Sequence, residues 1–162
     1  MTTKQQLTVR PANESDVPQI FRLLAFYAVK QIVLPRTEAD IRYYLGNFTV
    51  CAADGDIVGC MAVRDFGNRL FEVRSLAVKP EFQGRGIGRM LLTAAVERLK
   101  ENFERFKLFA LTYQSGFFIA SGFSKVEKTM FPEKIWSDCM LCAKREHCDE
   151  EAVLFEYDGS LR

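Results

Sequence analysis

The sequence predicts an α/β fold, a single domain in which helices cover both faces of a central mixed β-sheet. Strand-like runs with alternating apolar residues are interleaved with runs at helical spacing. Three strand-like runs follow one another before a helix, which favours a mixed sheet over regular βαβ alternation. The 162 residues, 48% of them hydrophobic, suffice for one compact core. We therefore expect one domain over 1–162, with its core at about 7–126 and a Cys-rich extension at about 127–162.

The chain begins with a predicted short strand and two helices. The run LTVRPA alternates apolar and polar residues and stops at a proline. Asn13 and Asp16 have the spacing of a capping pair, and apolar residues then recur at helical spacing to about Val29. A second helix is predicted in LPRTEADIRYYLG, where Thr37 and Asp40 repeat the capping spacing.

Three strands are predicted next. The run FTVCAADGDIVGCMAV reads as two strands joined at Asp54 and Gly55, a strong signal for a two-residue hairpin. The run LFEVRSLAV follows a turn at Gly67 and Asn68 and predicts a further strand. Beyond the next helix, KLFALTY predicts a buried strand, GFFIASGF a short helix, and the region near Lys125 a last strand.

The segment PEFQGRGIGRMLL places three glycines between a predicted strand and a predicted helix. Such a turn suits an anion, because the first N–H groups of a helix have no partner within the helix. A dinucleotide-binding fingerprint would need glycine at position 89, where Arg89 stands, and the Gly-Lys-Ser/Thr ending of a P-loop is absent. What remains is a polar residue followed by small ones, with several N–H groups directed at one spot.

Composition excludes several classes of partner. The formal net charge is +1, so there is no broad basic field for nucleic acid. No segment approaches the roughly 20 apolar residues of a membrane-spanning helix. The five cysteines occur without a secretion signal, which favours reduced thiols and a cytoplasmic location. We expect a small molecule as the partner.

The segments RSLAVKPEFQGRGIGRMLL and FFIASGF, with this order of elements, resemble the GNAT family of acetyl-CoA-dependent N-acetyltransferases over about residues 7–126. The resemblance implies acetyl-CoA as co-substrate, with its pantetheine arm on the backbone of Leu76, Ala77 and Val78. It also implies that the pyrophosphate binds at the loop and helix start formed by Gln83, Gly84, Arg85, Gly86, Ile87, Gly88 and Arg89.

A narrower similarity links LPRTEADIRYYLGNFTV, GNRLFEVRSLAV and LTYQSGFF to the N-acetylglutamate synthases, in particular their short free-standing members. It implies acetylation of the α-amine of L-glutamate, in arginine biosynthesis. Glutamine, a peptide N-terminus, lysine or a polyamine are alternative acceptors, and a non-catalytic acyl-CoA sensor is an alternative of another class. Family members commonly dimerise, so a homodimer is possible.

By the same resemblance Glu72 is the general base, and the backbone N–H of Leu76 polarises the thioester. In a regular strand positions 72, 74 and 76 share one face. The alternative for Glu72 is an exposed residue paired across strands. Phe118 stands where many relatives have a tyrosine that protonates the departing thiolate. Tyr113 is a candidate substitute, with packing after a buried strand as its alternative.

The substrate carboxylates would be bound by arginine, whose planar fork suits them. Arg36 and Arg69 match basic substrate-contacting positions of the synthases, with Leu34 beside Arg36. The alternative is that both arginines are merely solvated. Gln114 and Ser115 stand where the synthases have an Arg-Ser pair, so one cation is lost, and a glutamine acceptor would be tolerated.

The C-terminal segment carries a possible metal site. Cys139 and Cys142 have zinc-knuckle spacing and are followed by His147 and Cys148. Adjacent residues cannot easily both bind one ion, so a structural zinc is possible but small buried or reactive thiols are the favoured interpretation.

Overall fold

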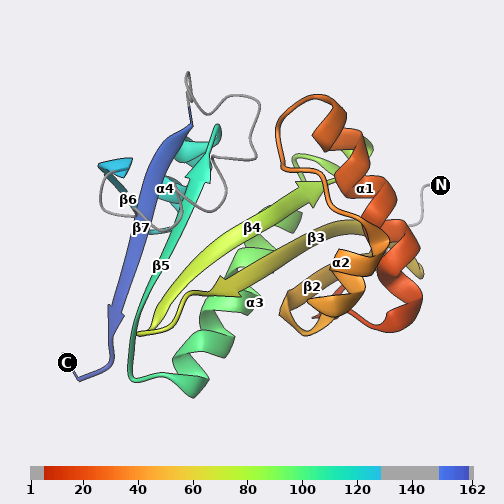
Figure 1. Ribbon diagram of the computed structural model, residues 1–162. Helices are drawn as coiled ribbons and strands as arrows, with labels where there is room; N and C mark the ends of the chain where they lie inside the picture. The colour runs from red at the N-terminus through yellow and green to blue at the C-terminus, as the bar shows by residue number, and fades with distance from the viewer. Residues whose placement is uncertain (1–5, 129–149, 161–162) are drawn as a thin grey trace. The chain divides into compact units, whose positions relative to one another are not determined.

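The computed structural model describes residues 6–128 and 150–160. They form a seven-stranded sheet of strand order β1-β2-β3-β4-β5-β7-β6, and the expected α/β class with helices is confirmed (Figure 1). The strands are β1 (Leu7–Pro11), β2 (Phe48–Ala53), β3 (Asp56–Asp65), β4 (Leu70–Val78), β5 (Arg105–Thr112), β6 (Ser124–Val126) and β7 (Glu151–Asp158). The helices are α1 (Val17–Val29), α2 (Glu38–Tyr43), α3 (Ile87–Asn102) and α4 (Ser115–Ala120), with short 3₁₀ turns η1 (Glu14–Asp16), η2 (Leu45–Asn47) and η3 (Pro80–Phe82).

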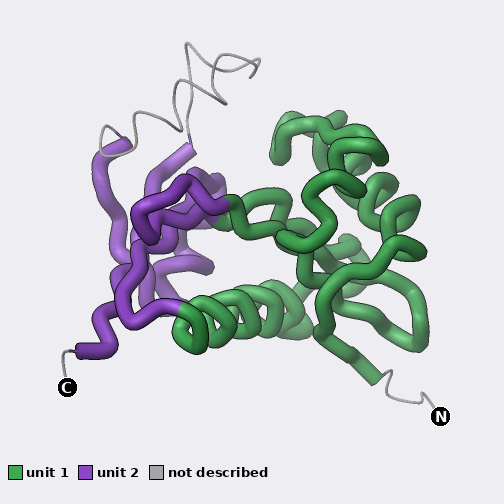
Figure 2. Tube along the Cα trace, turned by 60° about the horizontal axis from the view of Figure 1, so that its bottom comes forward, with its two compact units in different colours: residues 1–64, 73–102 green, residues 65–72, 103–162 purple. Residues whose placement is uncertain are grey.

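The chain divides into two compact units, coloured separately in Figure 2. Unit 1 comprises Met1–Arg64 and Val73–Asn102, and unit 2 comprises Asp65–Glu72 and Phe103–Arg162. β4 contributes its first three residues to unit 2 and the rest to unit 1. Within the described ranges, no helix is long and apolar enough to cross a membrane.

In unit 1 the first three strands are antiparallel, and the predicted hairpin is confirmed. β1 pairs with β2, and β2 with β3. Asp54 and Gly55 connect β2 to β3 with φ angles of 50° and 90°, the left-handed conformation that a two-residue hairpin turn requires at both positions. Aspartate and glycine are among the residues that accept this conformation, which explains why the sequence signal was reliable.

Helices cover both faces of the strands in unit 1. α1 and α2 pack through Ile20, Leu24 and Ile41 into a buried cluster that includes alternate residues of β2. In β3, Cys60 belongs to this cluster, whereas its neighbour Gly59 faces α3. Successive strand residues point to opposite faces, so α3 lies on the face opposite α1 and α2.

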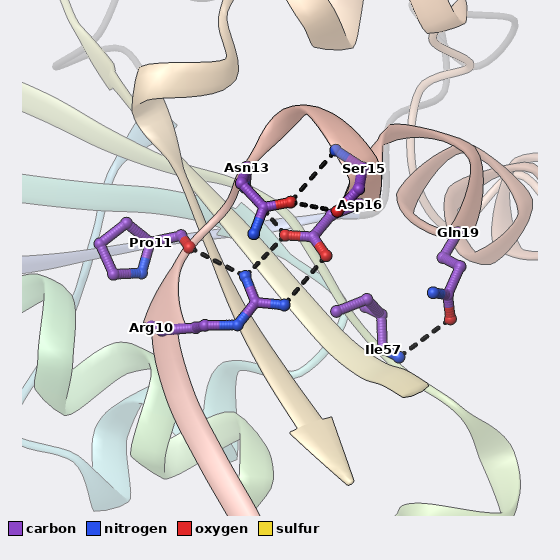
Figure 3. A network of polar contacts seen from close by, with 7 residues as sticks. All are labelled: Arg10, Pro11, Asn13, Ser15, Asp16, Gln19 and Ile57. Atoms are coloured by element: carbon purple, nitrogen blue, oxygen red, sulfur yellow. Dashed lines mark hydrogen bonds and ion pairs between the residues drawn. The ribbon is translucent and has the colours of Figure 1, made fainter. Parts of the chain in front are cut away.

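A polar network at the start of α1 fixes how the chain leaves β1 (Figure 3). Asp16 and Asn13 form the predicted capping box, which closes the 3₁₀ turn η1 immediately before α1. The guanidinium of Arg10 donates to both carboxylate oxygens of Asp16, at 2.7 and 3.0 Å. From α1, the side chain of Gln19 accepts a hydrogen bond from the backbone N–H of Ile57 at 3.0 Å.

Unit 2 is built on β5, which pairs in parallel with β4 and antiparallel with β7. β6 pairs with the other edge of β7. The sequence analysis had assigned residues 151–158 to the extension, but they form β7, whose Ala152, Val153 and Leu154 are buried in the sheet. The second half of residues 151–158 does alternate between apolar and polar residues. Its partners are distant in sequence, and pattern alone could not place it between β5 and β6.

Candidate active site

The glycine turn in unit 1 has the conformation that a helix-start anion site needs. Gly84 and Gly86 have φ angles of 79° and 80°, which L side chains rarely adopt. A Cβ at either position would meet nothing within 4 Å. Glycine is therefore required here by backbone conformation and not by crowding from the protein itself, and the space beside the turn is open to a ligand.

The turn leads directly into α3, a helix of 16 residues. The N–H of Met90 donates to the carbonyl of Gly86 at 3.0 Å, which starts the helical ladder. The N–H groups before it have no acceptor within the helix and lie at the positive end of its dipole. Ile87 is buried, whereas Arg85 and Arg89 are exposed at the turn. Such a turn can bind a phosphate-bearing ligand, as the sequence predicts.

Gly59 in β3 sets how closely the start of α3 approaches the sheet. A Cβ at Gly59 would lie 2.8 Å from Cγ2 of Ile87 and 3.3 Å from Cδ1 of Leu91. The first distance is shorter than real Cβ contacts and the second is tight, so a larger residue would require Ile87 or the start of the helix to shift. The absence of a side chain at Gly59 therefore positions the glycine turn through Ile87.

Ser75 interrupts β4 in a way that the sequence did not indicate. Its φ is 54°, in the left-handed region that a non-glycine residue seldom occupies inside a strand. The thiol of Cys60 donates to the carbonyl oxygen of Ser75 at 3.4 Å, and Nη1 of Arg36 donates to its hydroxyl at 3.3 Å. At such a residue the regular alternation of side chains between the two faces of a strand is interrupted. The expectation that Glu72 and Leu76 share one face, which rested on alternation, is therefore not supported.

Arg36 is one of the predicted substrate residues, and most of its side chain is enclosed. The side chain is 13% exposed, and its Nε donates to Asp40 at 2.7 Å. The guanidinium also lies over the ring of Phe48, 5.0 Å from the ring centroid. The alternative of a merely solvated arginine is wrong for Arg36. Leu34, predicted beside it, is half-buried.

Cys60 is completely buried, and this burial raises the pKa of its thiol to about 12. The nearby charge of Arg36 opposes the shift without reversing it. The thiol is therefore protonated at neutral pH and acts as a weak hydrogen-bond donor to Ser75. Cys51, on β2, is buried as well.

In unit 2, Glu72 is among the most deeply buried side chains, at 1% exposed. The alternative of an exposed glutamate is wrong. It pairs with Phe109 in the parallel ladder between β4 and β5, whose register runs over Leu70–Glu72. A carboxylate enclosed in this way has lost most of its hydration, and such an environment is typical of a proton acceptor tuned by its surroundings.

The remaining predicted residues of unit 2 lie in the turn before β4, in the segment after β5 and at the start of α4. Arg69, in the turn before β4, is exposed with a φ of 61°, and its carbonyl accepts from the N–H of Lys107. Tyr113 follows β5 and is half-buried. Gln114 is exposed, whereas the hydroxyl of Ser115 donates to the carboxylate of Glu151 at 2.9 Å.

Glu151 introduces a negative charge at the position where the resemblance predicted a lost cation. It also forms an ion pair with Lys125, and the hydrogen bonds from Lys125 and Ser115 lower the pKa of its carboxyl. Phe118, which replaces the tyrosine of many relatives, is buried and packs edge-on against Phe123. A proton donor at position 118 is therefore excluded by the side chain and by its place in the core.

Comparison with known proteins decides the family. Residues 45–125 match the acetyltransferase (GNAT) domain. The uncharacterized N-acetyltransferase CT2212 of Chlorobaculum tepidum is 40% identical over 146 residues, which cover 90% of this chain and 94% of that protein. This chain belongs to the GNAT family. The amino-acid acetyltransferase of Mycobacterium tuberculosis is 30% identical over 133 residues, 80% of this chain and 75% of that protein.

A solved GNAT structure shows the same fold. The N-acetylglutamate synthase of Neisseria gonorrhoeae, complexed with coenzyme A and N-acetyl-glutamate, superimposes with a TM-score of 0.79 and 24% identity. The match covers 95% of this chain and 36% of the synthase, so this chain spans about a third of that enzyme.

The protein is therefore an N-acetyltransferase, and its glycine turn fits acetyl-CoA as the co-substrate. The fit rests on two left-handed glycines beside open space at the start of a long helix. Gln83, one of the residues predicted to bind the cofactor, already forms hydrogen bonds within the protein. Gln83 donates its backbone N–H to Pro80, and its side-chain amide donates to Tyr27.

The predicted zinc site lies outside the described residues and remains a prediction; its candidate ligands are Cys139, Cys142, His147 and Cys148. Elsewhere, among residues 6–128 and 150–160, no three metal-ligating side chains lie close enough together to bind an ion.

Two residues near the glycine turn and β4, Ser75 and Tyr27, were not predicted from the sequence. Tyr27 did carry a signal, since a tyrosine on the buried face of a helix needs a partner for its hydroxyl.

Proposed function

We propose that this GNAT enzyme transfers the acetyl group of acetyl-CoA directly to the α-amine of L-glutamate, the first step of arginine biosynthesis. The observation that carries the proposal is the enclosed guanidinium of Arg36, which contacts the residue preceding Leu76. Relatives named amino-acid acetyltransferase, and the complex of the gonococcal synthase with N-acetyl-glutamate, support an amino acid as the acceptor.

In this proposal Glu72 removes the proton from the attacking ammonium or amine, directly or through water. A carboxylate is a suitable proton acceptor for this step, and Glu72 is enclosed away from bulk water. The backbone N–H of Leu76 would stabilise the charge that develops on the carbonyl oxygen. The thiolate of CoA is a good leaving group, so the reaction does not require an acid that protonates the sulfur. Tyr113 is an optional proton donor in this proposal.

Arg36 would bind a carboxylate of the acceptor. A guanidinium carries five N–H donors, and the two contacts to Asp40 and Ser75 leave capacity for a further carboxylate. Enclosure by Phe48 strengthens this interaction, because the charge is less screened by water. Arg69, exposed at the turn before β4, is proposed as a second and weaker contact.

A second acceptor class has its own support. The carboxylate of Glu151 accepts from Ser115, at the position where the synthases have an arginine beside serine. Here Glu151 is paired with Lys125, so the position offers no unpaired positive charge to an anionic substrate side chain and would accept a neutral carboxamide. L-glutamine is therefore the alternative acceptor.

We also propose the setting in which the enzyme works. The near-neutral charge and the cysteines support a cytoplasmic location for one domain over 1–162, with no nucleic acid or membrane partner. We propose a homodimer solely because members of the family commonly dimerise. Sedimentation of the purified protein tests it, and a monomer at all concentrations would contradict it.

Substitution of Arg36 tests the carboxylate contact. We expect Arg36→Ala to raise KM for the amino-acid acceptor about 10- to 100-fold, as for loss of a charge-assisted hydrogen bond, with the dissociation constant for CoA unchanged. The effect of Arg69→Ala should be smaller. Arg42→Ala is the matched control, because the ion pair of Arg42 with Glu14 is exposed. Equal KM values in the Arg36 variant and the control would contradict the contact.

A further inference from the structure

Tyr27 lies on the buried face of α1 and is 9% exposed. Its hydroxyl donates a hydrogen bond to the carbonyl oxygen of Val78 at 2.5 Å and accepts one from Nε2 of Gln83 at 2.9 Å. A phenol has a single proton to donate, and here that proton goes to Val78. Burial raises the pKa of Tyr27, so the donor stays protonated at neutral pH.

The two partners of Tyr27 are the two ends of one connection in unit 1. Val78 is the last residue of β4, and Gln83 is the residue directly before the glycine turn. Between them, the N–H of Lys79 donates to Val58 at 2.8 Å, and the N–H of Phe82 donates to Lys79 at 2.9 Å. A single phenol oxygen therefore fixes both the exit from β4 and the entry to the turn.

We infer that Tyr27 is a positioning residue for CoA, which acts through Val78 and Gln83 without contacting the ligand. The glycine turn must present its N–H groups in one arrangement to bind a pyrophosphate. A connection that is already fixed at both ends loses less conformational freedom on binding. When the hydroxyl is removed, both ends are released, and CoA binding bears the cost of ordering them.

Tyr27 is expected to affect the binding of CoA and not the chemical step. The proton acceptor proposed above is Glu72, and the hydroxyl of Tyr27 is bonded to neither Glu72 nor Leu76. Loss of the hydroxyl should therefore weaken CoA binding and leave the rate at saturation nearly intact. The inference requires acetyl-CoA as co-substrate. It does not depend on which amine accepts the acetyl group, so it can fail while the proposed acceptor stands, and the reverse.

The test is Tyr27→Phe, with the affinity for CoA alone measured by titration calorimetry. We expect the dissociation constant to rise about three- to tenfold, the range for one or two neutral hydrogen bonds, and KM for acetyl-CoA to rise equally. We expect kcat to stay within about twofold of the parent value. Tyr43→Phe is the matched control, because Tyr43 is 81% exposed and contacts Tyr44 by its ring.

Gln83→Leu extends the test, because it breaks the same link from the exposed side. In the Gln83→Leu background, Tyr27→Phe should add less than about a twofold loss of CoA affinity, since the two residues act together. Full additivity would overturn the inference, as would an unchanged dissociation constant in Tyr27→Phe. A fall in kcat at unchanged KM would overturn it too. If Tyr27→Phe does not fold, Gln83→Leu alone decides, and unchanged CoA affinity in that variant overturns the inference.

Discussion

Burial changes what a charged side chain can do, and Glu72 is the residue at which this matters most. In the sequence it is one of 21 acidic residues, and no local pattern distinguishes it from the others. In the structure it is enclosed in unit 2, whereas most glutamates of folded proteins remain hydrated. An enclosed carboxylate costs stability. Its enclosure beside the parallel ladder is why we propose it as the general base.

Substitution of Glu72 by glutamine tests that explanation. Glutamine keeps the shape but cannot accept the proton, so we expect Glu72→Gln to lower kcat about 10²- to 10⁴-fold. The affinity for CoA should not change, because the glycine turn is unaltered. Glu97→Gln, on the exposed side of α3, is the control. Turnover in Glu72→Gln equal to that of the control would exclude Glu72 as the base.

At the scale of elements, two features of unit 1 set the position of the helices against the strands. The capping network of Arg10 and Asp16 fixes the start of α1, and the bare backbone of Gly59 fixes the start of α3. α1 carries Tyr27, and α3 begins at the glycine turn. The positions of Tyr27 and of the glycine turn therefore depend on residues, Asp16 and Gly59, that lie outside the proposed CoA site.

The network at the start of α1 makes a prediction about pH. The hydrogen bond from Arg10 lowers the pKa of Asp16, despite opposing burial. A carboxyl whose pKa is lower in the folded state stabilises the fold above its unfolded pKa, near 4, and this contribution is lost as pH falls through the folded pKa.

We expect Asp16→Asn to lower the free energy of unfolding by about 1–3 kcal/mol at pH 7, because the side chain is nearly buried and bonded to a charge. In urea titrations, the difference between parent and variant should shrink below about pH 4. Glu14→Gln is the control, since its pair with Arg42 is exposed and contributes little. A difference that is constant from pH 7 to pH 2.5 would refute the role of the Asp16 charge.

Gly59 gives a second test at this scale. In Gly59→Ala the new methyl would collide with Ile87, so the start of α3 must shift, at a cost of about 1–3 kcal/mol of unfolding free energy. CoA affinity should fall with it. Gly46→Ala is the matched control, because nothing lies within 4 Å of its Cβ position. If Gly59→Ala were as stable as Gly46→Ala, the close approach of α3 would not be what positions the turn.

At the scale of the whole molecule, local patterns predicted most of the elements. The hairpin at Asp54 and Gly55 was correct because the turn geometry itself demands such residues. The apolar stripe of α3, from Ile87 to Leu99, is buried as its spacing indicates. These signals depend on residues a few positions apart, and sequence alone displays them fully.

Features that depend on distant contacts could not be predicted in this way. Serine has no preference for positive φ, and the conformation of Ser75 accompanies contacts from Cys60 and Arg36 on other elements. The hydroxyl of Tyr27 binds residues more than 50 positions away. Candidate site residues came from resemblance to a family, whereas their burial and partners came only from the structure.

The measurement that tests the central claim most directly is release of CoA from acetyl-CoA by the purified protein with each standard amino acid as acceptor. The account predicts turnover with L-glutamate well above the background hydrolysis and above the other amino acids, with L-glutamine as the nearest competitor. N-acetylglutamate should be identified as the product by mass spectrometry. If no amino acid raised CoA release above background, amino-acid acetylation would be contradicted, and the acceptor would have to be a different amine.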